Sequence, residues 1–448
     1  MSEPITYLVT NTATVFGILA VILGVVFYTH QSDKPIFRKF YKYVPALLLC
    51  YFIPSLLHTF HVVPYDYPCD QVLSGAIDAG NSVLTQCQNA AKPEDTKIAA
   101  NGSQIYYVAS RFLLPASLVL LTLSVDFKKI KALGPKALIL FLTGTLGIVI
   151  GGPIAVLLMS VINPDVVSGD VWRGLTTVAG SWIGGGANQA AMKEVFEVSG
   201  PLFSSMIAVD VIIANIWMAV LLYMAGSAKQ IDNKTGADTT AIEDLKETVE
   251  KFNRENAKNP NLTDLMLIVA LAFGATAIGH VVADNLAPLI ADVWPAASKY
   301  SLTSKFFWLI VTVTTLGLIA STTKLRNFEA VGASKVGSLF IYILVAAIGL
   351  HMDVGAILER PWLFLVGALW MIIHAGLMLT VAKLIKAPLF YMAVGSQANV
   401  GGAASAPIVA SAFHPSLAPV GVLLAVLGYA LGTYAAWVCG QLLMLAAG

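Results

Sequence analysis

Apolar residues occur in long runs along this chain of 448 residues, and shorter polar stretches separate the runs. A helix that crosses a bilayer needs about 20 consecutive, mostly apolar residues. The runs therefore predict about twelve transmembrane helices, with a range of about 11–13. The candidates are 12–28, 43–61, 104–124, 136–160, 171–195, 202–226, 263–283, 305–322, 336–352, 362–385, 393–413 and 417–445. This pattern is typical of an all-α polytopic membrane protein.

A polar stretch of mixed charge, residues 227–261, divides the apolar runs into two halves. It is expected to form a solvated helix and a linker. The predicted organisation is a first transmembrane repeat over 1–226, the polar linker, and a second transmembrane repeat over 262–448. The helices within 104–226 and 336–448 are expected to form a core, and the other helices a scaffold.

Basic residues predict which loops face the cytoplasm, because short loops rich in Lys and Arg lie inside. Such loops follow the first and third runs, precede the run 336–352 and follow the run 362–385. With these loops inside, the two halves are inverted relative to each other. Twelve crossings, six in each half, would instead bring the chain back to its starting side and make the halves parallel. One crossing is therefore miscounted. The first suspect is the amphipathic segment 284–304, which is expected to be an interfacial helix, a re-entrant piece or a poor span.

Composition changes this picture little. Hydrophobic residues make up 57% of the chain and charged residues 12%, and the net charge is +1. Nothing here indicates binding to nucleic acid. No transition-metal ligand spacing, phosphate loop or catalytic dyad occurs, so neither an enzyme, nor a cofactor, nor a transport ATPase is expected.

The four cysteines fall into two groups. Cys50 and Cys439 lie in apolar runs and are expected to be packing residues. Cys69 and Cys87 lie in the polar stretch between His61 and Gln104, which the basic loops place outside. They can form a disulfide there, with two free thiols as the alternative.

A glycine-rich segment with amide side chains occurs twice, at 180–192 and at 395–407. Each glycine destabilises a helix interior by about 1 kcal/mol. Backbone groups freed at membrane depth must be satisfied inside the protein or face a wet cavity. Two such breaks at matching places in the two halves indicate a transporter's binding site. Close helix packing is the alternative explanation, but it does not require the amides and hydroxyls beside the glycines.

Other matched features support a duplication. An apolar run ends at Asp126 in one half and at Asp353 in the other, and Trp217 and Trp437 follow the two glycine segments at similar distances. The similar order at nearly constant spacing favours an internal repeat. Asp126 and Asp353 are expected to cap or tether loops.

The two breaks together are predicted to bind the solute and a coupling cation. Half-helix N-termini favour anionic groups, while bare carbonyls and C-termini favour cations. Arg111 can bind a carboxylate bidentately or anchor its helix at the membrane interface. The predicted substrate-binding residues are Gly180, Ser181, Gly185, Gly186, Asn188, Gln189, Ser396, Gln397, Asn399, Gly401, Gly402, Ser405 and Arg111.

Asp210 is the clearest charged residue inside an apolar run, and such residues are usually functional. The matching region of the second half, 427–433, has no acid, as expected for a single cation or proton site. A buried Asp that only supports packing is the alternative. The predicted ion-binding residues are Asp210, Asn188, Asn399 and Asn215. His374, also within a run, can relay protons, but a hydrogen-bonded structural role is favoured.

The two glycine segments and the tail 428–434 resemble DUF819, a family of bacterial and plastid integral membrane proteins also called YjcL-like. That family resembles the superfamily of cation/proton antiporters, bile-acid sodium symporters and glutamate/sodium symporters. The resemblance implies two inverted repeats, each with one discontinuous helix. The two helices would cross in a mobile core beside a scaffold that often dimerises. It also implies a bacterial inner membrane. The single acid Asp210 departs from the adjacent acid pair of electrogenic antiporters.

The sequence therefore predicts a secondary active transporter that couples a small carboxylate or amino-acid-like solute to Na⁺ or H⁺. The expected partners are the solute, the lipid bilayer and a second copy in a homodimer. A monovalent cation/proton antiporter is the first alternative. An intramembrane enzyme, a sensor and a channel are further alternatives.

Overall fold

A computed structural model describes most of the chain. The described residues are 9, 11–41, 44, 46–60, 62–63, 66–69, 73, 87–89, 97–99, 101–237, 260–350, 359–414 and 417–448. They divide into two compact units. Unit 1 contains 1–114 and 339–358, and unit 2 contains 115–338 and 359–448. These packing units cut across the two predicted repeats, whose division at the linker stays a prediction.

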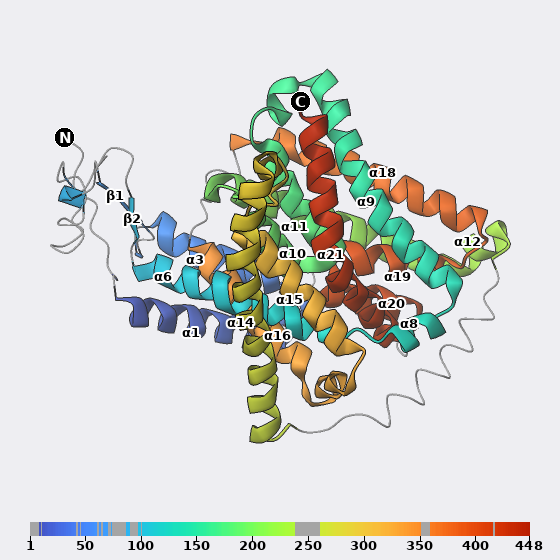
Figure 1. The fold of residues 1–448 in the computed structure, drawn as a ribbon. Helices are drawn as coiled ribbons and strands as arrows, with labels where there is room; N and C mark the ends of the chain where they lie inside the picture. The colour runs from blue at the N-terminus through green and yellow to red at the C-terminus, as the bar shows by residue number, and fades with distance from the viewer. Residues whose placement is uncertain are drawn as a thin grey trace. The chain divides into compact units, whose positions relative to one another are not determined.

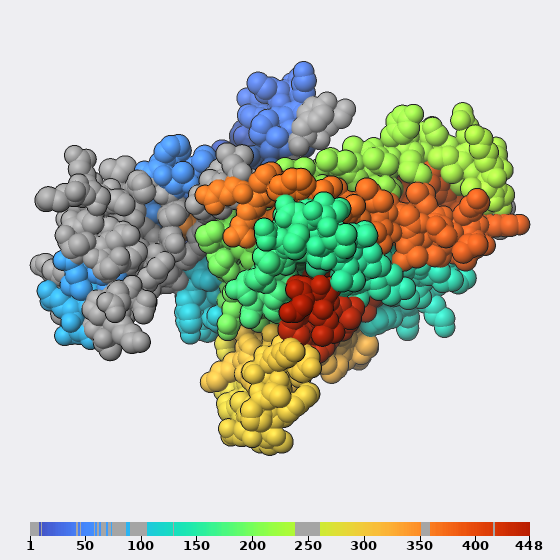
Figure 2. Space-filling model, turned by 90° about the horizontal axis from the view of Figure 1, so that it is seen from above, coloured from blue at the N-terminus to red at the C-terminus, as the bar shows by residue number. Residues whose placement is uncertain are grey.

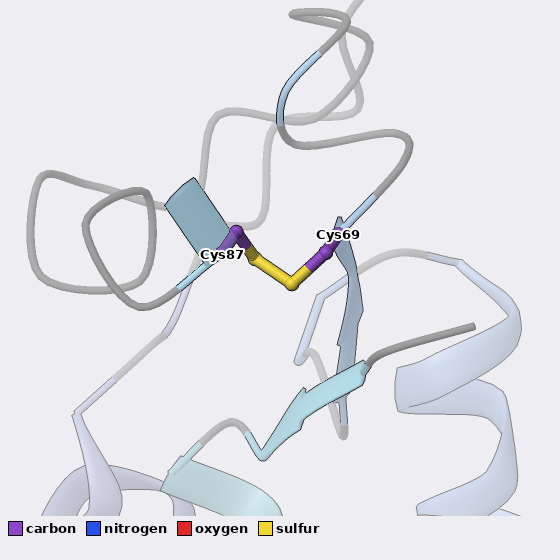
Figure 3. Close-up of a disulfide and its surroundings, with 2 residues drawn as sticks. All are labelled: Cys69 and Cys87. Carbon is purple, nitrogen blue, oxygen red and sulfur yellow. A yellow bond between two sulfur atoms is a disulfide. The ribbon is translucent and has the colours of Figure 1, made fainter. Parts of the chain in front are cut away.

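Unit 1 consists of helices and one small antiparallel sheet. Its elements are α1 (Thr12–His30), α2 (Pro35–Tyr41), α3 (Ala46–Thr59), β1 (Asp66–Pro68), β2 (Lys97–Ala99), α6 (Asn101–Val108) and the π-helical turn η2 (Ala109–Leu113). A disulfide joins Cys69 to Cys87 beside the sheet (Figure 3). Of the two alternatives left open for these cysteines, the structure has the disulfide. Cys50 and Cys439 are free and buried, as expected.

All regular elements in the described residues of unit 2 are helices (Figure 1). Its elements are α7 (Leu114–Leu123), α8 (Phe127–Ala132), α9 (Pro135–Ile162), η3 (Pro164–Val167), α10 (Val171–Val195), α11 (Gly200–Ala225), α12 (Ala228–Thr235), α14 (Leu262–Val293), η4 (Pro295–Tyr300), α15 (Lys305–Ser321), η5 (Lys324–Val331), α18 (Trp362–Leu384), α19 (Leu389–Val400), α20 (Gly402–Phe413) and α21 (Ala418–Ala446). The remaining helix, α16 (Ala333–Gly349), belongs partly to each unit.

The all-α polytopic class is confirmed, and within the described residues the small sheet of unit 1 is the only non-helical regular element. Seven helices among the described residues are long and apolar enough to cross a membrane, or nine if each bent helix pair is one span. The expected count of about twelve spans is thus not confirmed. The segment 284–304 is not a separate element either, because α14 continues through Pro288 to Val293 and a short 3-10 helix follows.

Helices α9 and α18 lie side by side and run antiparallel (Figures 1 and 2). Near the start of α9, Lys136 Nζ donates to the carbonyl of Lys386, just after the end of α18, at 3.0 Å. Further along, Trp370 Nε1 donates to the Ile148 carbonyl at 2.8 Å. The two helices precede the two glycine segments, so the matched parts of unit 2 have opposite directions.

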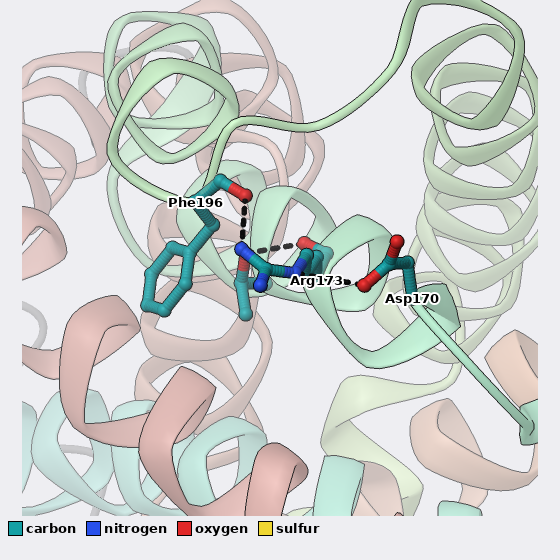
Figure 4. A network of polar contacts seen from close by, with 4 residues as sticks. Asp170, Arg173 and Phe196 are labelled. Carbon is teal, nitrogen blue, oxygen red and sulfur yellow. Dashed lines mark hydrogen bonds and ion pairs between the residues drawn. The ribbon is translucent and has the colours of Figure 1, made fainter. Parts of the chain in front are cut away.

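The first glycine segment turns back on itself instead of passing through the unit. Gly185, in the middle of α10, has φ 73° and ψ −172°, a conformation open only to glycine. At the ends of α10, Arg173 Nη1 donates to the Phe196 carbonyl at 3.1 Å (Figure 4). The rings of Trp172 and Phe196 are 5.8 Å apart. A straight helix over this distance would separate its ends by about 35 Å. Residues 171–195 therefore form a helical hairpin, called hairpin 1.

The second glycine segment forms a similar hairpin. Helices α19 and α20 meet at Gly401 and Gly402, where Gly402 has φ +57°. Near the far ends of these helices, the rings of Phe390 and Phe413 lie 5.4 Å apart. Residues 389–413 are called hairpin 2. Both predicted helix breaks are confirmed, but the expectation that each broken helix spans the membrane is wrong, because both arms return to the same end.

The two hairpins resolve the conflict between loop charge and span number. Without them, the apolar segments leave about ten candidates for crossings, about five in each half. An odd number of crossings in each half inverts the second half relative to the first. This inversion agrees with the basic loops and with the antiparallel directions of α9 and α18. The hairpins, rather than 284–304, are therefore the better candidates for the miscounted segments.

Candidate functional site

The tips of the two hairpins meet inside unit 2. A Cβ atom placed on Gly402 would lie 3.8 Å from the Cα of Gly185. Hairpin 1 follows the end of α9 and hairpin 2 follows the end of α18. Because α9 and α18 are antiparallel, the hairpins enter from opposite ends of this helix pair. Four half-helix ends, two N-terminal and two C-terminal, thus come together at one place.

Asp210 of α11 joins the two arms of hairpin 1. Its carboxylate accepts hydrogen bonds from Ser181 Oγ at 2.7 Å, Trp182 Nε1 at 2.7 Å and Gln189 Nε2 at 2.9 Å. Ser181 and Trp182 precede the break at Gly185, and Gln189 follows it. The carboxylate is buried, with 6% of the residue exposed. Three neutral donors compensate for the loss of water around this acid.

Helix α11 also contacts hairpin 2. Trp217 lies two turns after Asp210 and donates its Nε1 hydrogen to Ser396 Oγ at 2.8 Å. The same Oγ lies 2.8 Å from His374 Nε2, and His374 Nδ1 lies 3.1 Å from the Gly144 carbonyl. Both ring nitrogens of the buried His374 are therefore bonded, in agreement with the structural role favoured for it. Helix α11 thus links the tip regions of both hairpins.

Asn188 and Asn399 attach the hairpins to long helices. Asn188 Oδ1 accepts from Thr433 Oγ1 of α21 at 2.7 Å, and its Nδ2 donates to the Gly184 carbonyl at 3.1 Å. Asn399 Oδ1 accepts from Thr145 Oγ1 of α9 at 2.7 Å, and its Nδ2 donates to the Phe141 carbonyl at 3.0 Å. Both amides are fully buried and bonded at both ends. This geometry favours packing, and their predicted role in solute and ion binding stays a prediction.

Gln397 and Ser405 face each other across hairpin 2. Gln397 Nε2 donates to Ser405 Oγ at 2.7 Å, and Gln397 Oε1 is buried without a hydrogen-bond partner among the described residues. A side chain at Gly401 would overlap both groups. The glycine at this position therefore makes room for the pair.

The glycines of hairpin 1 also allow close contact. A Cβ atom on Gly180 would lie 2.7 Å from the Asn188 carbonyl oxygen of the opposite arm. At the tip, Gly185 and Gly186 are half-buried, so their backbone is accessible. All predicted residues of the two glycine segments therefore lie on the hairpins, and most of them lie near the tips.

Two predicted residues are not placed at the site. Asn215 Nδ2 donates to the Val211 carbonyl of its own helix at 2.7 Å, and no bond to Asp210 is found in the described region. Arg111 lies in unit 1, in the π-helical turn before Pro115. Pro115 has no N–H for the carbonyl four residues earlier, which explains a local departure from the α-helix. The roles of Asn215 and Arg111 stay predictions.

The matched acids at the run ends differ in what the structure describes. Asp126 Oδ1 pairs with Arg326 Nη1 at 2.7 Å and accepts the Lys128 backbone N–H at 3.1 Å. Asp126 therefore tethers the loop, as expected. Asp353 lies outside the described residues.

Sequence reasoning missed the side chains that hold the hairpins in place. Trp182 is part of the first glycine segment, and a tryptophan among glycines at membrane depth was a usable signal. In the sequence, Trp217 serves only as a marker of the repeat. Thr145 and Thr433 carried no signal, because a threonine in an apolar helix usually bonds its own backbone.

The assembled site has the groups to bind a small polar molecule and an alkali cation. It offers free helix-end N–H and C=O groups, one carboxylate and several neutral oxygens. Within the described ranges, no three His, Cys, Asp or Glu side chains are grouped so that they could hold a metal ion. An alkali cation would therefore be bound mainly by carbonyl, amide and hydroxyl oxygens.

Comparison with known proteins identifies the family. Residues 95–445 match the family described as "Protein of unknown function (DUF819)". The chain is 25% identical over 349 residues to "Uncharacterized membrane protein YjcL" of Bacillus subtilis (strain 168). This match covers 74% of the chain and 82% of the relative. With its several apolar helices, the chain is a multi-pass membrane protein and belongs to the DUF819 family.

Proposed function

We propose that this protein is a secondary active transporter of a small organic solute. The solute is a carboxylate or an amino-acid-like anion, and its movement is coupled to Na⁺ or H⁺. The protein acts in a bacterial inner membrane, as a homodimer, without enzymatic activity or a cofactor. The observation that carries the proposal is the meeting of Gly185 and Gly402 at the tips of two hairpins that enter from opposite ends.

The two meeting hairpins support transport because they combine one binding site at their tips with possible access from both sides of the membrane. Non-helical backbone at membrane depth is tolerated only inside protein or beside a water-filled cavity. Binding sites of transporters lie at the interface between inverted repeats, and rocking of one bundle against the other exposes them alternately. Each hairpin base would then face one side of the membrane.

Two cavities support access from both ends. One of about 510 Å³ lies at the base of hairpin 1, between the starts of α10, α11 and α18. The other, of about 680 Å³, lies between the end of α7, η5 and the start of α21, which follows hairpin 2. Both are lined by charged side chains, which suits the entry of polar solutes.

Asp210 provides a mechanism for coupling. A cation at the carboxylate would need oxygen ligands in place of hydrogen-bond donors. Ser181 and Gln189 can turn to present oxygens, whereas Trp182 can only donate. Cation binding would therefore rearrange the side chains that hold the two arms of hairpin 1 together, and so would change the conformation of its tip.

A thermal-shift screen of the purified protein tests the proposal. Carboxylates, amino acids and short peptides are added in Na⁺ buffer and, as a control, in K⁺ buffer. Because a ligand that binds only the folded state stabilises it by mass action, we expect one solute class to raise the melting temperature. Absence of any shift over the whole screen would contradict a solute transporter.

The alternative of a cation/proton antiporter has one supporting observation, the buried carboxylate of Asp210. It predicts Na⁺ movement driven by a pH gradient in proteoliposomes without any solute. Na⁺-dependent uptake of a labelled carboxylate would exclude it.

A further inference from the structure

One end of the Gln397 amide has no hydrogen-bond partner among the described residues. Gln397 is 1% exposed, its Nε2 donates to Ser405 Oγ, and its Oε1 is buried without a hydrogen bond in the described part of the chain. A buried polar atom without a partner is costly, so each instance in a native protein requires an explanation.

The amide lies beside an accessible stretch of chain. A Cβ atom on Gly401 would overlap Gln397 Nε2, which places the amide against the tip of hairpin 2. Next to it, Gly401 and Ser405 are half-buried and Ala404 is exposed. The first turn of α20 is therefore accessible, although Gln397 itself is enclosed.

Hairpin 1 shows what satisfies a similar pair of side chains. Ser181 and Gln189 have the same spacing as Gln397 and Ser405, and both donate to the carboxylate of Asp210. The region of α21 that matches Asp210 in sequence, 427–433, contains no acid. Hairpin 1 thus has a polar partner within the protein, whereas hairpin 2 retains an unused acceptor.

The free groups at hairpin 2 define the chemistry of a ligand. The first backbone N–H groups of α20 have no partner within their own helix, and they favour an anion. Beside them, Gln397 Oε1 requires a hydrogen-bond donor. A ligand that satisfies both must carry a donor close to its anionic group.

We propose that Gln397 Oε1 and the first turn of α20 bind a carboxylate that has a hydroxyl or amino group on the carbon next to the carboxylate. In such a molecule the donor is only a few bonds from the anionic group. The two parts of the site are also close together, because the Gln397 amide contacts Ser405 in the first turn of α20. This inference rests on the proposed transport function and narrows its solute class. A plain carboxylate would leave Gln397 Oε1 buried and unpaired.

Isothermal titration of the purified full-length protein in Na⁺ buffer tests this proposal with three solutes of equal length. Propionate, L-lactate and L-alanine differ only in the group on the second carbon. A site built to bond a hydroxyl or amino group discriminates strongly against an analogue without it. We expect L-lactate or L-alanine, whichever donor fits, to bind at least about tenfold more tightly than propionate.

Two matched variants locate the effect. Gln397→Met removes the acceptor at nearly constant length and should abolish the preference over propionate. Gln441→Met is the control, because Gln441 also has a buried, unpartnered Oε1 but lies within the continuous helix α21, where its Nε2 faces the Tyr300 carbonyl. This variant should keep the preference. The comparison of the three solutes on the unaltered protein needs no variant to fold.

Equal binding of the three solutes overturns the inference and leaves the transport proposal standing. A preference that persists in Gln397→Met also overturns it. If none of the three binds, the inference fails, and the wider solute screen then decides whether the transport proposal fails with it.

Discussion

Arg173 and Phe196 are separated by 23 positions in the chain, yet the Arg173 guanidinium donates to the Phe196 carbonyl at 3.1 Å. Arg173 also pairs with Asp170 at 2.9 Å and lies over the Trp172 ring at 4.9 Å. These contacts close the base of hairpin 1. Residues 171–195 have the length of a membrane span, but these contacts hold the start of the first arm beside the end of the second arm.

Arg173→Met should loosen this base. The Phe196 carbonyl would lose its charged donor, at a cost of about 1–3 kcal/mol. We expect faster hydrogen–deuterium exchange in the second arm, residues 186–196. Arg326→Met removes a similarly exposed arginine from its pair with Asp126 and should leave this exchange unchanged. Unchanged exchange in Arg173→Met would contradict the closed base.

Gly185→Ala should disturb the tip of hairpin 1. The conformation at Gly185 is open only to glycine, so a Cβ atom there costs about 1–3 kcal/mol of backbone strain. The control is Gly274→Ala, in the continuous helix α14, where a Cβ atom meets nothing within 4 Å. That change should be neutral or stabilising by up to about 1 kcal/mol. The measurement is thermal unfolding in detergent, and equal melting temperatures for both variants would refute the predicted strain.

The parts of this fold that could be predicted are those with a local cause. Each glycine destabilises a helix interior, and those at 185, 401 and 402 stand in clusters beside amide side chains, so the breaks were visible in the sequence. The sequence did not show that the second arm of each hairpin folds back beside the first. Two short apolar arms together have the same length and apolarity as one spanning helix. The contacts that decide between them, such as Phe390 with Phe413, form only after folding. The mismatch between the number of spans and the loop charges showed that a crossing was miscounted. It did not show which segment was the miscounted one.

The candidate site was predictable to a similar extent. Asp210 stood out because an acid in an apolar run is rare, and Ser181 and Gln189 stood out because they flank glycines. That these three side chains bond to one another could not be read from sequence, since it depends on how α11 packs against α10.

Asp210→Asn should weaken hairpin 1 and remove an ion effect. One carboxylate oxygen of residue 210 becomes an NH₂ group, which cannot accept the hydrogen bond that the oxygen accepted. We therefore expect the free energy of unfolding to fall by about 1–3 kcal/mol. If Asp210 binds the cation, stabilisation by Na⁺ should also disappear. Asp284→Asn makes the same change at an exposed acid, paired with Lys305, and should keep the Na⁺ effect. Na⁺-dependent stabilisation that survives Asp210→Asn would exclude Asp210 from the cation site.

Asp232 should make stability depend on pH. It lies on the polar helix α12 and accepts the Leu389 backbone N–H, at the start of α19, at 2.8 Å. Burial raises the pKa of this carboxyl, and the bond from Leu389 opposes the shift. The folded state therefore binds the proton more tightly than the unfolded state. This contribution to stability is complete below the ordinary Asp pKa of about 3.9 and is lost as pH rises through the folded pKa.

Asp232→Asn should remove this dependence while it keeps an acceptor for the Leu389 N–H. Its stability relative to the unaltered protein should increase over the range that begins at the ordinary Asp pKa of about 3.9 and extends upward through the folded pKa. Asp232→Ala leaves the N–H without its acceptor and should be about 1 kcal/mol less stable than Asp232→Asn at every pH. Thermal unfolding as a function of pH measures both. A difference between Asn and Asp that stays constant over this range would contradict the raised pKa.

The central claim is that the meeting hairpin tips form the site of a coupled transporter. Uptake of a labelled carboxylate or amino acid by proteoliposomes, with an inward Na⁺ or H⁺ gradient and with no gradient, tests it most directly. We predict accumulation that requires one of the two gradients and falls at least about tenfold in Gly185→Ala, with Gly274→Ala unchanged. Gradient-driven movement of Na⁺ alone, with no solute uptake, would contradict it.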